Sequence, residues 1–108
     1  MHIIIKEENG FMPDTLIKIY EDRIEVSENN KEKTLGYDKN EAKNIMEVFL
    51  EIFKGWNSKY VDNGIIDDDA FVITIVGNTK KEIYIKNKYP SNWSKFILFR
   101  NKLLREEL

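Results

Sequence analysis

The longest periodic pattern of apolar residues runs from Asp38 to Tyr60. Within it the apolar positions recur at intervals of three and four, which is the spacing of one face of an α-helix. They are Ala42, Ile45, Met46, Phe49, Leu50, Phe53, Trp56 and Tyr60. Asp38 followed by Glu41 has the form of a capping box, so we expect the helix to begin there. Gly55 interrupts the pattern, and we expect the helix to extend past it into residues 58–60.

Four shorter segments precede this helix, and we expect each to be a strand. They cover residues 2–6, 15–20, 23–27 and 32–37. The segments 15–20 and 23–27 show the period-two spacing of apolar residues that is typical of a strand, and residues 2–6 carry a short apolar run. Asn9-Gly10 and Asn29-Asn30 mark turns between them. Because the connections are too short for crossovers, we expect an antiparallel meander.

Two strands and a second helix follow. Residues 70–76 are apolar at every position but one, which is typical of a central strand, and residues 80–88 alternate. We expect an odd-length loop at 77–79, which places Ile83 and Ile85 on the same side as Ile73. A last helix capped by Ser91 or Asn92 should run to about Glu106. We expect Trp93 on its apolar face and Trp56 on the first helix to belong to the core.

The resulting order is ββββαββα. It predicts an α+β fold: a two-layer sandwich in which a mainly antiparallel sheet of about six strands carries both helices on one face. The 108 residues are the length of one domain, so residues 1–108 are expected to form a single unit.

Composition narrows the function classes. The absence of cysteine excludes disulfides and thiolate chemistry and fits a reducing cytoplasm. No apolar run is long enough to span a membrane. The net charge is −2, yet residues 1–69 hold sixteen of the nineteen acids and only nine of the seventeen bases. Such asymmetry marks either a charged partner or two complementary parts of one domain.

Catalytic motifs are missing. His2 is the only histidine, and it has no nameable partner for proton transfer. No serine stands in a nucleophile elbow, and no glycine-rich loop opens a helix, as phosphate sites require. The sequence therefore predicts no catalytic residue, no cofactor and no enzymatic activity.

The densest charge feature is the acidic loop formed by Asp67, Asp68 and Asp69, with Asp62 nearby. Clustered carboxylates suit a hard cation, but three consecutive acids cannot all reach one ion without a tight loop. We expect a solvated loop or an acidic contact for a basic partner. A metal-dependent enzyme using Asp67–Asp69 is an alternative hypothesis.

The second candidate surface is the sheet face that the helices leave open. Val72, Thr74, Tyr84 and Lys86 should point outward together, and exposed apolar patches mark contact surfaces. An aromatic ring flanked by lysines could also stack a nucleic-acid base, using Lys80, Tyr84, Lys86 and Lys88. One tyrosine is thin support for that use, so nucleic acid is disfavoured.

The C-terminal part contains Ile66-Asp67, then two predicted strands, and then Tyr89-Pro90-Ser91-Asn92-Trp93 at the start of a predicted helix. Over residues 45–104 it resembles a group of small uncharacterised bacterial α+β domains, although Asp68 stands where that group has Gly. The resemblance implies a fold and a bacterial source but no catalytic residue. Some small proteins of this look neutralise toxins as immunity proteins, which is an analogy.

These observations predict a cytoplasmic, non-catalytic bacterial protein-interaction domain, with an immunity-type toxin inhibitor as the narrower hypothesis. Its partner would be another protein, such as a toxin, or a second copy in a homodimeric structural domain. A metal-dependent enzyme and a weak nucleic-acid binder are two further hypotheses, each less favoured by the residues present.

Overall fold

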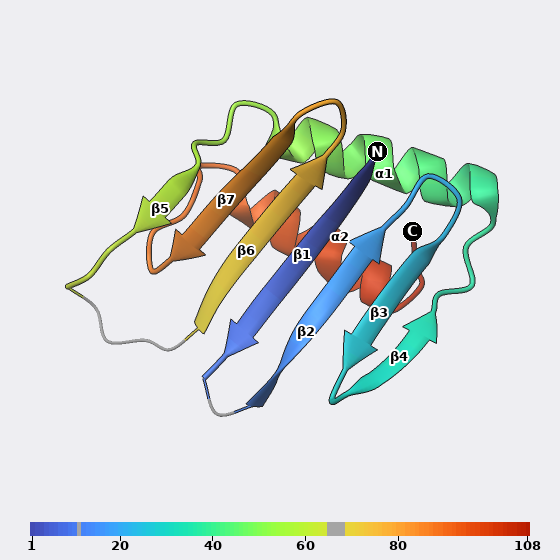
Figure 1. Ribbon diagram of the computed structural model, residues 1–108, viewed down its shortest axis with the longest axis horizontal. Helices are drawn as coiled ribbons and strands as arrows, with labels where there is room; N and C mark the ends of the chain where they lie inside the picture. Colours follow the sequence, from blue (N-terminus) through green and yellow to red (C-terminus); the bar gives the residue numbers. More distant parts are fainter. Residues whose placement is uncertain (11, 65–68) are drawn as a thin grey trace.

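A single sheet backed by two helices accounts for the regular structure of the residues that the structure describes (Figure 1). The computed structural model describes residues 1–10, 12–64 and 69–108. The strands are β1 (His2–Asn9), β2 (Met12–Ile19), β3 (Ile24–Glu28), β4 (Lys31–Thr34), β5 (Lys59–Val61), β6 (Asp69–Val76) and β7 (Lys80–Lys86), and the helices are α1 (Lys39–Phe53) and α2 (Trp93–Leu104). The fold is therefore α+β in the predicted order, with one strand more than expected.

The seven strands lie in the order β4-β3-β2-β1-β6-β7-β5. The first four form the predicted antiparallel meander. β1 also pairs antiparallel with β6, so the two hairpin regions join through the first strand. β6 and β7 pair with Ile73 opposite Ile83, which confirms the odd-length loop at 77–79.

The predicted extension of α1 into residues 58–60 is wrong. α1 ends at Phe53 because Lys54 is already extended and Gly55 has a φ of +81°, a conformation that glycine adopts without strain. The chain then turns, and residues Lys59–Val61 form β5, which runs parallel to β7. Tyr60 continues the apolar face of the pattern, but it does so from a strand.

The start of α1 agrees with the prediction. The Asp38 carboxylate accepts a hydrogen bond from the Glu41 backbone N–H at 2.8 Å, and the Glu41 carboxylate accepts one from the Asp38 N–H at 3.0 Å. Together these two bonds satisfy donors that helix geometry leaves unpaired.

Both helices cover the same face of the sheet, as Figure 1 shows. Alternate residues of the strands are buried beneath them: Ile3, Ile5, Ile17, Ile19, Ile24, Val26, Ile73, Ile83 and Ile85. α1 adds six buried side chains, and α2 adds Phe96 and Leu103. No described helix is long and apolar enough to cross a lipid bilayer.

An aromatic cluster joins the two helices to β6. Trp56 is buried, as predicted, whereas Trp93 lies half-buried at the edge of the core. Asn92 precedes α2 but makes no side-chain cap, contrary to the simplest expectation. Its amide instead accepts from the Trp56 indole N–H at 2.7 Å and donates to the Ile52 carbonyl at 3.0 Å. Asn92 therefore ties the start of α2 to the end of α1.

Phe96 lies at the centre of this cluster and is fully buried. Its ring contacts the rings of Phe49, Phe53, Trp56, Phe71 and Trp93.

Replacing Phe96 by Ala should lower the free energy of unfolding by about 3–5 kcal/mol, because it opens a cavity that rigid neighbours cannot fill. Urea denaturation measures this loss. Leu98→Ala, on the exposed side of the same helix, is the matched control and should change stability by about 0.5 kcal/mol or less. Equal losses in both variants would show that the cluster is not a rigid core.

Candidate functional site

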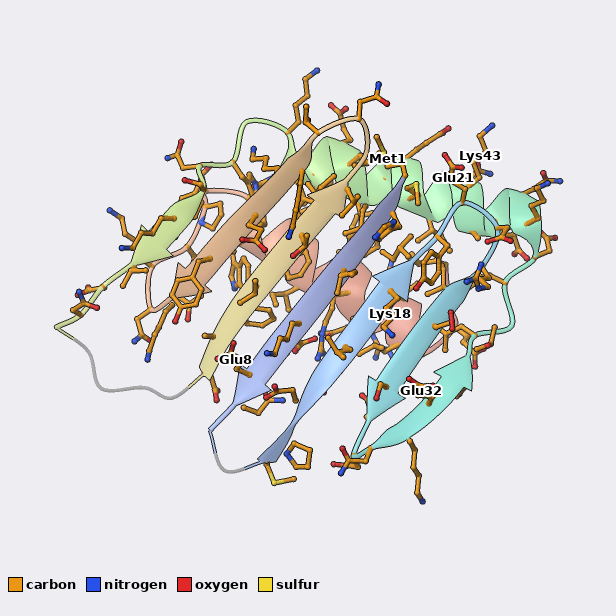
Figure 2. The ribbon with its side chains drawn as sticks, viewed as in Figure 1. Met1, Glu8, Lys18, Glu21, Glu32 and Lys43 are labelled. Carbon is orange, nitrogen blue, oxygen red and sulfur yellow. The ribbon has the colours of Figure 1, made fainter. Side chains whose placement is uncertain are left out.

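The face of the sheet opposite the helices is a broad surface built from the strands of the described part of the chain. We call it the open face. It consists of outward residues of the seven strands and of Tyr20, which follows β2. The strand residues are Asp14, Leu16 and Lys18; His2, Ile4, Lys6 and Glu8; Glu25, Ser27, Glu32 and Thr34; Val72, Thr74 and Val76; Lys80, Glu82, Tyr84 and Lys86; and Lys59 and Val61. Figure 2 shows Lys18 and Glu32 in front of the sheet, while α1, which carries Lys43, runs behind it.

Apolar side chains gather where β2, β1, β6 and β7 meet. Leu16 and Val72 stand on either side of Lys6 in the strand pairing, and Tyr84 stands beyond Val72. Leu16 and Val72 are partly exposed, and Tyr84 is 37% exposed. The central part of the open face thus offers apolar area and one aromatic ring to a partner.

Salt bridges lie within and beside this area. The Lys6 ammonium lies 3.6 Å from an Asp14 carboxylate oxygen and 3.8 Å from one of Glu8. Arg23, in the turn after β2, lies over the Tyr20 ring at 4.1 Å and contacts Glu25 at 3.2 Å. These pairs are exposed, so each contributes little to stability. Their charges remain available to attract or repel a partner.

The structure brings together the four sheet residues proposed from the sequence. Val72 is directly opposite Tyr84 across the β6–β7 pairing, Thr74 is opposite Glu82, and Lys86 follows two positions after Tyr84. All four lie on the open face, as predicted. They are part of a wider surface that the sequence did not reveal.

Neither Asp62 nor Asp69 lies among the outward residues of that surface. The Asp62 carboxylate accepts a hydrogen bond from the Gly64 N–H at 2.9 Å, within the turn after β5. Asp69 begins β6 opposite Asn9 and alternates with Val72 and Thr74, so it belongs to the other set of positions. Asp67 and Asp68 lie outside the described residues, and the prediction for that loop stays a prediction.

The described residues form no cluster of metal ligands. Among them, no group of three or more His, Cys, Asp or Glu side chains lies close enough to hold a metal ion. His2 is on the open face, where its ring lies 5.7 Å from that of Tyr20. Its observed role is a cross-strand aromatic contact.

A charged pair lies on the opposite side of the sheet, between β1 and α2. The Glu7 carboxylate accepts two hydrogen bonds from the Arg100 guanidinium, from Nε at 2.8 Å and from Nη2 at 2.5 Å. The Glu7 side chain is only 6% exposed, whereas that of Arg100 is 23% exposed. Burial raises the pKa of Glu7 above its ordinary value, and the bonds from Arg100 oppose that rise. The pair fastens α2 to the sheet.

Two further groups with a shifted pKa, Glu106 and Tyr37, lie where the C-terminal residues meet the loop before α1. Glu106 accepts a bond from the Gly36 N–H at 2.6 Å, which lowers the pKa of Glu106, and Lys33 adds to this effect from 3.5 Å. Burial raises the pKa of Tyr37, whose hydroxyl accepts from the Leu108 N–H at 3.2 Å. These contacts hold the end of the chain in place.

Sequence reasoning missed the part of the open face supplied by β1 to β5. The alternation in residues 15–20 indicated that this segment has an outward set, but not that this set lies near Val72. The pairing of β1 with β6 supplies that information. Lys59 and Val61 were missed because their segment was assigned to the helix.

No family model matches the chain, and no curated protein or solved structure matches it either. The geometry of the open face is therefore the basis for a functional proposal.

The buried pair leads to a prediction about pH. Arg100→Met keeps the apolar stem but leaves Glu7 buried without a partner, so the pKa of Glu7 should rise further. A carboxyl group whose pKa is higher in the folded protein than in the unfolded protein leaves stability unchanged at low pH. It lowers the stability of the fold as the pH rises from the unfolded pKa, about 4.3, through the folded pKa. The variant should thus lose about 2–4 kcal/mol relative to the parent at pH 8 and less near pH 4.

Denaturant titrations across this pH range measure the difference, and the double variant Glu7→Gln with Arg100→Met is the control. In the double variant the additional loss at high pH should disappear, because no buried carboxylate remains. A loss in Arg100→Met that is the same at every pH would show that Glu7 is not the group responsible.

Proposed function

We propose that this chain is a non-catalytic protein-interaction domain and that its contact surface is the open face. The occupant is the surface of a folded protein. The observation that carries the proposal is the composition of this face: apolar and aromatic side chains flank Lys6 on the central strands, with further charged side chains around them. Apolar area surrounded by a polar rim is typical of protein interfaces.

The shape of the open face supports a protein rather than a small molecule. Small-molecule sites are concave and enclose most of the ligand, whereas a sheet exposes a broad surface. Tyr84 provides a rigid ring with a polar end, the kind of side chain that is enriched at protein contacts. Val72 and Leu16 provide apolar area beside it.

The proposal extends the sequence interpretation. The lack of cysteine fits a bacterial cytoplasm, which we propose as its location. In its narrower form, the proposal is that the chain is an immunity-type inhibitor that binds a toxin. The resemblance in residues 45–104 supports that form.

A photo-crosslinking amino acid at position 84 tests the contact surface, because Tyr84 is exposed on the open face. Irradiation in cells should give one discrete product, identified by mass spectrometry. The same amino acid at position 98, exposed on α2, is the matched control and should give no such product. Adding Val72→Asp should reduce the product at position 84 at least about tenfold, because it places a charge in the apolar area. Equal products from both positions, or no effect of Val72→Asp, would refute the proposal.

A further inference from the structure

Charge is distributed unequally over the open face, with β1 as the dividing line. The outward residues of β2, β3 and β4 include three acids and one lysine, Asp14, Glu25, Glu32 and Lys18, and Arg23 in the turn after β2 adds a second cation beside them. Those of β6, β7 and β5 include three lysines and one acid: Lys59, Lys80, Lys86 and Glu82. We call these the acidic half and the basic half. On β1, Lys6 and Glu8 balance each other.

This distribution is self-complementary under one symmetry operation. Suppose that two copies pack with their open faces together and that a two-fold axis runs between them, parallel to β1. The rotation then brings the acidic half of each copy onto the basic half of the other. A two-fold axis across the strands would instead bring like halves together and cost repulsion.

The strand pairing shows which residues this rotation brings together. One continuous row crosses all seven strands, and it consists of Glu32, Ser27, Leu16, Lys6, Val72, Tyr84 and Lys59. Lys6 is at its centre. Leu16 and Val72 are one strand away on either side, and they would pack together across the axis. Glu32 and Lys59 are three strands away on either side, and they would form a pair at each rim.

The rotation also brings like charges together at four places. Lys6 and Glu8 would each lie on the axis near their own copies, but the two pair with each other and Lys6 also pairs with Asp14. The adjoining row would bring Glu25 near Glu82, and the row beyond it would bring Arg23 near Lys80. Within each chain Glu25 contacts Arg23 at 3.2 Å, and Glu82 contacts Lys80 at 3.5 Å. These approaches therefore involve paired rather than bare charges.

The area of the face is sufficient for association. Six inter-strand spacings of about 4.8 Å and strands about 20 Å long give roughly 600 Å² from each copy. The total, roughly 1,200 Å², is at the lower end of the range for stable specific interfaces. Two sheets packed face to face with nearly aligned strands are also a common arrangement.

We propose that the open face binds a second copy of this chain, forming an isologous dimer whose two-fold axis is parallel to β1. This inference rests on the proposed function and names its partner. Its specific consequence is that Glu32 of one protomer lies against Lys59 of its partner.

Sedimentation velocity of the purified chain tests this dimer. The parent should be dimeric at about 100 μM, because this concentration is well above the micromolar dissociation constants at the weak end of the range for standard-size interfaces. Glu32→Lys and Lys59→Glu should each raise the dimer dissociation constant by about tenfold or more, because each sets like charges against each other at both rims. Mixing the two variants should restore dimerisation, since the mixed dimer contains only opposite-charge pairs. Lys43→Glu, on the outer surface of α1, should leave the constant unchanged.

The outcomes separate this inference from the proposed function. A parent chain that stays monomeric overturns the dimer, while crosslinking from position 84 to a different protein would still support the contact surface. A dimer that ignores both charge reversals, or variants that do not recover on mixing, would assign the association to another surface and overturn the inference. Circular dichroism confirms that each variant is folded.

Discussion

The pairing of β1 on both of its edges is the constraint on which the other features depend. β1 pairs with β2 on one side and with β6 on the other, so its register decides which residues of both neighbours face the helices. Side chains alternate along a strand, and a slip by one residue would exchange the two sets. Ile3 and Ile5 would then leave the core, and Ile4 and Lys6 would enter it. Burying Lys6 without a partner would be costly, so this register is strongly specified.

The sequence predicted what is determined by neighbours along the chain. The capping box at Asp38, the hairpin at residues 77–79 and the inward sets of residues 15–20, 23–27, 70–76 and 80–88 all follow from local spacing. Features set by distant contacts were missed. β5 is a strand because β7 lies beside it, whereas its own three residues continue a helical pattern. Asn92 has the residue type of a helix cap, yet the nearby Trp56 indole and Ile52 carbonyl compete for its amide.

The same distinction explains how much of the candidate site could be found. Val72 and Tyr84 were correctly placed together because one short hairpin connects their strands. Leu16 could not be assigned to the same surface from the sequence. It lies near Val72 only because β1 pairs with both β2 and β6. Glu7 and Arg100 are 93 positions apart, and only the packing of α2 on β1 brings them into contact. Glu7 stands at the next inward position after Ile3 and Ile5, and an acid at an inward position indicates a buried partner for its charge.

The sheet has two edges as well as a face, and the physics of the edges supports association through the face. An unpaired edge strand is a template for another chain unless it is short or charged. β4 is four residues long, entirely exposed and carries Lys31, Glu32 and Lys33. β5 has only three residues. Both edges are therefore poor templates for strand addition. The open face carries the apolar side chains of the longer central strands and can bury them only against another surface. Hydrophobic burial thus favours contact through the face, while the charges on the two edge strands would set the orientation of the partner.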